Sequence, residues 1–231
     1  MITDVSILIP AYQPDEKLAA LVARLRDEFA HVVIVDDGST EGRDVFDAIR
    51  PQVDAVVAHE VNRGKGAALK TGFAWIRDHQ PDVCGVVTAD ADGQHTVEDI
   101  RRVAEAVKTH PGGLVLGVRH FGLKVPFRSR FGNHWTSCFF WLLTGLAIKD
   151  TQTGLRGIPR GLLDRVLALK GDRYEYEMRM LVDARLHEQK PLQIPIETVY
   201  IDGNKSSHFH PLRDTILTQR ALLSARFGRE R

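Results

Sequence analysis

Residues 31–40, HVVIVDDGST, decide the fold class of this chain. Val32–Val35 is an unbroken run of β-branched apolar residues, which is typical of a strand covered by helices on both faces of a parallel sheet. Asp36 and Asp37 follow this run directly. Open α/β sheets bind ligands beyond the carboxyl ends of their strands, so these acids are candidate ligand-binding residues. The alternative is that they form a turn and the N-cap of the next helix.

Strand and helix alternate through the first half of the chain, around this stretch. The predicted strands are Val5–Ile9, Val32–Val35, Ala55–Ala58, Val83–Thr88 and Leu114–Leu116. The predicted helices are Asp15–Phe29, Asp44–Ile49, the part of 62–79 that follows an opening loop, and Val97–Lys108. Such alternation is typical of right-handed βαβ units, so we expect an α/β fold with a mostly parallel central sheet and helices on both faces.

The alternation ends after Gly117. The later predicted elements are a helix with an aromatic face over 128–148, a strand over 155–158, helices over 161–169 and 175–188, a strand over 192–199 and a helical segment from Pro211. No stretch rich in Gly, Pro or Ser divides the chain. We therefore expect one domain over 1–231, with two functional halves at 1–117 and 118–231.

Composition and charge indicate a soluble globular protein. The net charge of +1 gives no bias toward nucleic acid, and we expect no nucleic-acid partner. Cys84 and Cys138 are too few for a disulfide framework or a metal site and fit a reducing compartment. The N-terminus has no secretory signal pattern, and the longest apolar segment, 138–148, is about half as long as a membrane span. These features predict a cytoplasmic protein.

A second acidic stretch, ADADGQH at 89–95, follows the fourth predicted strand. Asp90, Asp92 and Gln94 occupy alternate positions, and in an extended segment alternate side chains point the same way. Grouped carboxylate and amide oxygens suit Mg²⁺ or Mn²⁺, which complete their coordination with water and substrate phosphates. Solvated turn acids are the alternative, but the position at a strand end and the earlier acid pair favour a metal site.

A Gly-rich loop, NRGKG at Asn62–Gly66, follows the third predicted strand and opens a helix. Its glycines would let the backbone approach a ligand, and the helix N-terminus is partly positive, so a diphosphate would fit there. The loop is not a Walker loop, because G-x-x-x-x-G-K-S/T is absent. It is also misplaced for a dinucleotide fingerprint, which follows the first strand.

Taken in order, these residues resemble the family 2 glycosyltransferases, which have the GT-A fold. The matching pieces are SILIPAYQ at 6–13, VIVDDGST at 33–40, NRGKGAALKTGF at 62–73, ADADGQH at 89–95 and DTQTGLRG at 150–157. The resemblance spans nearly the whole chain and is greatest to the polyprenyl-phosphate branch, which includes dolichyl-phosphate mannose synthase and dolichyl-phosphate glucosyltransferase. It implies a nucleotide-sugar-binding half over 1–117 and an acceptor-side half over 118–231.

The resemblance also implies roles for particular residues. The implied metal ligands are Asp90, Asp92 and Gln94. The implied contacts of the nucleotide sugar are Pro10, Tyr12, Asp36, Asp37, Lys65, Asp90, Arg119 and Lys205. The residues implied in catalysis are Asp92, Asp150, Arg156 and Glu177. Arg119 and Arg156 would meet phosphates, Asp37 would contact the nucleoside, and Tyr174–Glu177 would border the sugar.

The implied reaction is inverting, metal-dependent transfer of a hexose from a nucleoside-diphosphate sugar to a polyprenyl phosphate. A phosphate acceptor needs no strong base, because the second pKa of the phosphate is about 6 and the group is ionised at neutral pH. A hydroxyl acceptor on a glycan is the alternative, and it would need a carboxylate base such as Asp150, Glu175 or Glu177. A sugar-phosphate nucleotidyltransferase and an inactive nucleotide-sugar-binding assembly subunit are further alternatives, which the loop position and the intact acid clusters disfavour.

Residues 119–149 interleave basic and aromatic side chains. Such segments can lie in the lipid headgroup layer, which would present the site to a lipid-linked acceptor at the cytoplasmic face of a membrane. A core helix, a homodimer face and an integral-membrane partner are the alternatives.

Two expectations concern single side chains. On the predicted helix 175–188, the residues expected to face inward are Met178, Leu181, Val182 and Leu186. His95 is expected at the surface or beside phosphate rather than on zinc.

Overall fold

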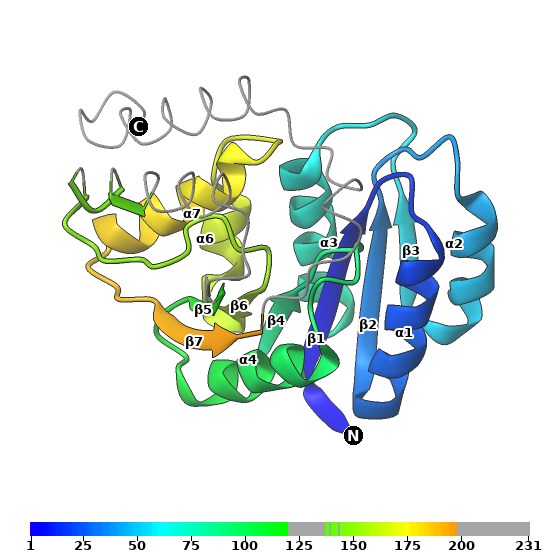
Figure 1. Cartoon of the computed structure of the whole chain (residues 1–231), viewed down its shortest axis with the longest axis horizontal. Coiled ribbons are helices and arrows are strands. Elements are labelled where there is room, and N and C mark those ends of the chain that lie inside the picture. The colour runs from blue at the N-terminus through cyan, green and yellow to red at the C-terminus, as the bar shows by residue number, and fades with distance from the viewer. Residues whose placement is uncertain (120–136, 139, 143, 198–231) are drawn as a thin grey trace.

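The computed structural model describes residues 1–119, 137–138, 140–142 and 144–197. Figure 1 shows a central twisted sheet with helices on both sides of it. The sheet has seven strands in the order β3-β2-β1-β4-β6-β5-β7. The strands are β1 Ile2–Ala11, β2 Phe29–Asp36, β3 Ala55–Ala58, β4 Gly85–Thr88, β5 Val115–Arg119, β6 Arg156–Pro159 and β7 Leu192–Ile196.

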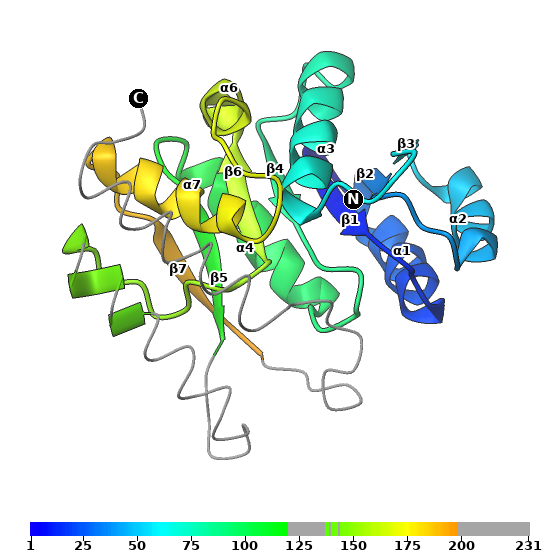
Figure 2. The same ribbon diagram turned by 90° about the horizontal axis from the view of Figure 1, so that it is seen from above.

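Helices cover both faces of the sheet, as predicted. The helices are α1 Glu16–Glu28, α2 Arg43–Ile49, α3 Lys65–His79, α4 Val97–Thr109, α6 Leu163–Leu167 and α7 Glu175–Leu186, with 3₁₀ turns at Arg50–Gln52 and Arg160–Leu162. Successive strand residues face opposite sides. Ile7 and Ile9 therefore join the core under α1, α2 and α4, whereas Leu8 joins the core under α3, α6 and α7. Figure 2 shows α3 and α6 on one side of the strands and α1 and α4 on the other.

Most neighbouring strands are parallel, as predicted. β1 pairs in parallel with β2 and β4, β2 with β3, and β5 with β7. β6 is antiparallel to both β4 and β5. Thr88, at the end of β4, pairs with Arg156, at the start of β6. The residues just before β6 therefore lie at the carboxyl end of β4, where the acidic stretch begins.

The elements differ from the predicted ones mainly at their ends. Asp15 is the N-cap of α1 rather than its first residue, because its carboxylate accepts a hydrogen bond from the Lys17 N–H at 3.0 Å. The predicted helix 161–169 is a 3₁₀ turn followed by the short helix α6. Leu186 was predicted to face inward but is 65% exposed. It is the last residue of α7, at the end of the helix that packs over the sheet.

Several predictions fall outside the described residues, namely most of the helix 128–148, the helical segment from Pro211, and Lys205. In the described part of the aromatic segment, Phe140 is buried, whereas Trp141 and Leu142 are 53% and 70% exposed. Among the described residues, no helix combines the length and the apolar character that crossing a membrane requires.

Candidate active site

The candidate active site lies at the carboxyl ends of β1, β2 and β4. β1 lies between β2 and β4, so the chain runs outward to β3 and then returns to the other side of β1. Open α/β sheets bind ligands at such a switch point. Pro10 pairs with Val35 and Ala11 with Asp36. The end of β1, which leads to Tyr12, is therefore beside the acids that follow β2, as the sequence predicts.

The carboxylate of Asp37 holds the Gly-rich loop in place. Its Oδ1 accepts a hydrogen bond from the Arg63 backbone N–H at 2.9 Å, and its Oδ2 accepts one from the Gly64 N–H at 2.8 Å. The Nδ1 atom of His59 lies 2.7 Å from Asp37 Oδ1. Only 5% of the Asp37 side chain is exposed. This arrangement favours the turn-forming alternative for Asp37 over the predicted contact with a nucleoside.

Replacing Asp37 by Asn should lower the stability of the protein. The amide offers one acceptor oxygen where the carboxylate has two, so a buried N–H of the loop loses its partner at a cost of about 2 kcal/mol. Thermal unfolding should show a Tm lower by about 5 °C. Asp36→Asn is the matched control, because Asp36 accepts a single backbone hydrogen bond, from Ser39 at 2.8 Å. Equal Tm values for the two variants would contradict the assignment of Asp37 as the anchor of the loop.

The glycines of the NRGKG loop make room for the protein's own chain. A Cβ on Gly64 would lie 2.5 Å from Asp172 O, and one on Gly66 would lie 2.8 Å from Arg173 O. Backbone from residues 172 and 173 therefore fills the space on the Cβ side of these glycines, and the approach of a diphosphate to the loop stays a prediction. The close packing fixes the position of Lys65, which lies between the two glycines and begins α3.

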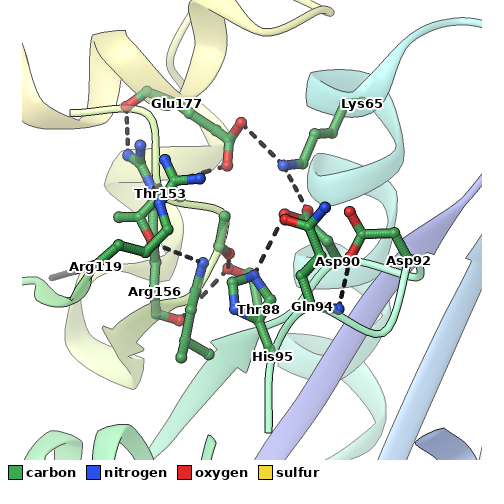
Figure 3. A network of polar contacts seen from close by, with 12 residues as sticks. Lys65, Thr88, Asp90, Asp92, Gln94, His95, Arg119, Thr153, Arg156 and Glu177 are labelled. Carbon is green, nitrogen blue, oxygen red and sulfur yellow. Dashed lines mark hydrogen bonds and ion pairs between the residues drawn. The ribbon is translucent and has the colours of Figure 1, made fainter. Parts of the chain in front are cut away.

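Asp90 and Asp92 follow β4 as predicted, but a turn begins at Ala91 and includes Asp92, so the segment is not extended. Gly93 has a φ of 75°, and the Gln94 backbone N–H donates to Asp92 Oδ1 at 3.0 Å. The expected geometry of alternate side chains on an extended chain is therefore wrong. The turn still brings both carboxylates to the tip of β4, where Figure 3 shows them below the Lys65 ammonium.

Lys65 links the acids of the β4 tip to α7. Its Nζ lies 2.7 Å from Asp90 Oδ1 and 3.1 Å from Glu177 Oε2. Figure 3 shows the three side chains converging from α3, the β4 tip and α7. The exposed fractions are 17% for Lys65, 8% for Glu177 and 31% for Asp90, so Glu177 is buried and the other two side chains are partly exposed. The Nε2 atom of His95 lies 3.4 Å from Asp90 Oδ2, on the other side of the carboxylate.

The two strand-tip acids differ in electrostatic environment. Burial opposes ionisation of Asp90, but the nearby Lys65 and His95 lower its pKa well below the usual range. Burial and the negative charge of Asp90 raise the pKa of Asp92. Burial would lower the pKa of Lys65, yet Asp90 and Glu177 raise it, so its amine is firmly protonated.

Asp90, Asp92 and Gln94 fit a divalent metal ion by the chemistry of their donor atoms. Carboxylate and amide oxygens are hard ligands of the kind that Mg²⁺ and Mn²⁺ prefer. The raised pKa of Asp92 reflects burial and repulsion from Asp90, and a bound cation would offset both. In the described ranges, however, no cluster of three or more His, Cys, Asp or Glu residues could hold a metal ion by itself. A metal ion here would need Gln94 and oxygens from water or substrate.

Residues 150–157, DTQTGLRG, lie next to the site and contact its acidic residues Asp90 and Glu177. Asp150 is fully buried and binds Arg119 with both carboxylate oxygens, at 2.7 Å from Nε and 3.1 Å from Nη2. Gly154 faces Asp90, since a Cβ on Gly154 would lie 2.5 Å from Asp90 Oδ1 and closer still to Oδ2. The glycine of this motif therefore leaves room for the Asp90 carboxylate.

Arg156 is buried behind Glu177 and is only 1% exposed. Its guanidinium donates to the backbone carbonyls of Thr151, Thr153 and Glu177, at 3.2, 2.8 and 2.5 Å. Its Nε lies 3.8 Å from Glu177 Oε1. The predicted phosphate contact is therefore wrong for Arg156, because its donors are used by buried carbonyls. The residue supports Glu177 instead.

Asp150 and Tyr176 also differ from their predicted roles. Both oxygens of Asp150 bind Arg119, so the carboxylate is not placed to act as a base. Tyr176 was expected to border the sugar, but it is fully buried and its hydroxyl donates to Val166 O at 2.8 Å. A phosphate contact of Arg119, whose side chain is 26% exposed, stays a prediction.

Sequence reasoning missed the roles of two histidines. His95 was expected at the surface or beside phosphate, but it is 7% exposed and lies next to Asp90. His59 links Asp37 to α3, with its Nε2 2.9 Å from Thr71 Oγ1. His59 follows β3 directly. Its position could have predicted that it lies near the site, because the carboxyl ends of parallel strands meet at one edge of the sheet.

Comparisons with known proteins agree with this architecture. A family model described as glycosyl transferase family 2 matches residues 6–167. The UDP-N-acetylglucosamine–dolichyl-phosphate N-acetylglucosaminyltransferase of Methanococcus voltae is 28% identical over 221 residues, which cover 85% of this chain and 86% of that protein. The undecaprenyl-phosphate mannosyltransferase of Micrococcus luteus is 30% identical over 204 residues, which cover 83% and 82%.

A solved structure shows the same fold. Glucosyl-3-phosphoglycerate synthase from Mycobacterium tuberculosis, in complex with Mn²⁺, UDP and glucosyl-3-phosphoglycerate, aligns with a TM-score of 0.70 and 18% sequence identity. The alignment covers 97% of this chain and 80% of that one, and the predicted GT-A fold is confirmed. The predicted polyprenyl-phosphate branch is confirmed by the curated relatives. Because the family model matches well over half of its residues, the chain is a glycosyltransferase and belongs to glycosyl transferase family 2.

Proposed function

We propose that the chain transfers a hexose from a nucleoside-diphosphate sugar to a polyprenyl phosphate, with inversion at the sugar carbon and with Mg²⁺ or Mn²⁺ bound. The observation that carries this proposal is the cluster of Asp90, Asp92, Lys65 and Glu177 at the switch point of the sheet. Support for the acceptor comes from the curated relatives, which are named as dolichyl-phosphate and undecaprenyl-phosphate sugar transferases. Support for the metal comes from the donor set and from a structural neighbour solved with Mn²⁺ and UDP.

The metal ion would be held by Asp90, Asp92 and Gln94. When bound, it would neutralise part of the charge on the diphosphate leaving group. The Lys65 ammonium would add a second positive charge on the same side of the site. Asp92 and Glu177 would orient the donor sugar, and Arg156, 3.8 Å from Glu177, would keep Glu177 in place.

Inversion would follow from a single displacement. An acceptor phosphate oxygen forms a bond to the sugar carbon while the bond from that carbon to the diphosphate breaks on the opposite face. The acceptor is already ionised, so no proton has to be removed. This suits a site in which Asp150 is bound by Arg119 and Glu177 lies between Lys65 and Arg156, because both carboxylates already contact cationic partners within the protein.

Asp92→Asn tests the site. Transfer should fall by about a thousandfold, because one of the two strand-tip carboxylates is lost from the proposed metal site. The Tm should stay equal or rise, because the amide removes a partly buried negative charge that is repelled by Asp90. The measurement is sugar transfer to undecaprenyl phosphate, with Asp82→Asn, at an exposed turn position, as the control. An Asp92→Asn enzyme as active as the control would place the chemistry elsewhere.

The acceptor is tested by comparing undecaprenyl or dolichyl phosphate with oligosaccharides, using a donor nucleotide chosen by thermal shift with and without Mn²⁺. Transfer to the lipid phosphate alone supports the proposal. Transfer to oligosaccharides would support the hydroxyl-acceptor alternative, for which a carboxylate base is needed. Nucleotide-sugar binding without transfer to any acceptor would support an assembly subunit.

We also propose a peripheral position at the cytoplasmic face of a membrane. A polyprenyl acceptor resides in the membrane, and the exposed Trp141 and Leu142 offer apolar surface next to α7, where Arg185 Nε donates to Thr144 O at 2.5 Å. Flotation with liposomes containing anionic lipid tests this position. A homodimer face or an integral-membrane partner would instead appear as a larger species by light scattering.

A further inference from the structure

We infer that Lys65 is the internal counter-ion of the acidic site, and that its ammonium must leave Asp90 when a divalent cation binds. This inference rests on the proposed function for its metal site. It adds a specific role for Lys65, which is to set the affinity of the protein for the metal ion and to couple metal binding to nucleotide binding.

The geometry of Lys65 carries the inference. Its ammonium lies 2.7 Å from Asp90 Oδ1, which is a short, charge-assisted contact with a proposed metal ligand. It also lies 3.1 Å from Glu177 Oε2 and 5.9 Å from the centre of the Tyr174 ring. The same ammonium can therefore release Asp90 and still keep an anion and an aromatic face as partners.

The base of the Lys65 side chain is fixed, whereas its tip is on a flexible stem. Gly64 and Gly66 on either side are packed against residues 172 and 173, and Asp37 binds the Gly64 backbone. The Cα of Lys65 is thus held, but four methylene groups separate it from the ammonium. A change of rotamer is sufficient to move the charge, without a shift of α3.

The balance of charge explains why the ammonium must move. Asp90, Asp92 and Glu177 bring three negative charges to the network, and Lys65 and the buried Arg156 bring two positive ones. A divalent cation bound to Asp90 would repel the ammonium and would need oxygens of the same carboxylate that the ammonium contacts at 2.7 Å. Lys65 and the metal ion therefore compete for Asp90.

The competition has a thermodynamic consequence. Part of the affinity of the acids for metal is used to displace Lys65, so the metal ion alone binds weakly. A nucleoside diphosphate supplies new anionic partners for the displaced ammonium. Metal ion and nucleotide should therefore increase each other's affinity, and by linkage the factor is the same in both directions.

Direct measurement of Mn²⁺ binding tests the inference on the full chain. The free Mn²⁺ signal is followed by electron paramagnetic resonance, first with Mn²⁺ alone and then with UDP or GDP. Lys65→Met should bind Mn²⁺ alone about tenfold more tightly than the wild type, and the gain in affinity on adding nucleotide should shrink. Lys70→Met is the matched control. It lies on the same helix and its partner is Asp172, at 2.7 Å, so its Mn²⁺ affinity should equal that of the wild type.

The outcomes separate this inference from the proposed function. Equal or weaker Mn²⁺ binding by Lys65→Met, with clear binding by the wild type, overturns the counter-ion role and leaves the proposed metal dependence intact. Absence of Mn²⁺ binding by every variant, with and without nucleotide, overturns both.

A second measurement uses the wild type, because Lys65→Met leaves buried acids without a partner and could impair folding. Brief acylation with acetic anhydride, read by peptide mass spectrometry, reports how accessible each lysine amine is. Saturating Mn²⁺ should increase acylation of Lys65 severalfold and leave that of Lys70 unchanged. Unchanged acylation of Lys65 would show that the ammonium stays on Asp90 and would overturn the inference.

Discussion

Gly154→Ala is expected to reduce kcat/KM for sugar transfer by about a hundredfold or more, while the protein still folds. The added methyl group would overlap both carboxylate oxygens of Asp90, at 2.5 Å from Oδ1 and closer to Oδ2. The carboxylate is the end of a side chain and can rotate away, so the cost to stability should be small. Its new position would no longer match the proposed metal site, and a small misplacement of this kind has a large effect on rate.

Gly161→Ala is the matched control for this prediction. A Cβ on Gly161 would have no atom within 4 Å among the described residues, so activity and Tm should equal those of the wild type. Mn²⁺ binding measured on both variants links the loss of rate to Asp90. If Gly154→Ala retained activity within threefold of the wild type, Asp90 would not depend on the space that the glycine leaves.

Arg156→Met should be the most destabilising of the substitutions considered. The change removes a buried guanidinium that binds three carbonyls, and it leaves Glu177 with Lys65 as its remaining cationic partner among the described residues. Breaking a buried ion pair in this way costs about 3–5 kcal/mol. Urea denaturation should show a lower midpoint with an unchanged slope, because the surface exposed on unfolding is the same.

Arg101→Met provides the comparison for Arg156. Arg101 lies on α4 and pairs with Glu98, Glu105 and Glu28, but these groups face water, so the midpoint should move far less. Similar shifts for both variants would contradict a supporting role for Arg156. Sugar transfer by a folded fraction of Arg156→Met should be reduced as well, because Glu177 loses the group that holds it.

The sequence was sufficient to predict the sheet and the edge that bears the site. Buried strands of a parallel sheet read as runs such as Val32–Val35, and polar residues directly after them mark the carboxyl edge. The run before Asp36 and Asp37 and the run before Asp90 both follow this rule, and both ends meet beside β1. These strand ends alone placed Asp37 and Asp90 on the same side of the molecule.

Partners within the site could not be predicted in the same way. Gly64 and Gly66 permit a close approach, but the sequence does not say whether a ligand or residues 172 and 173 make it. Arg156 and Asp150 are charged residues in a motif, and such residues can face a substrate or pair inside the protein. Their pairing with Glu177 and Arg119 depends on β6 returning antiparallel beside β4, which local patterns do not encode.

The ion pair between Arg119 and Asp150 also has a consequence for how this enzyme could diversify. Arg119 ends β5 and Asp150 begins the DTQTGLRG motif. The ion pair therefore holds together two positions that are 31 residues apart in the sequence. Any change in length or composition between these two positions must keep both charges, because Asp150 without Arg119 would be an unpaired charge in the interior.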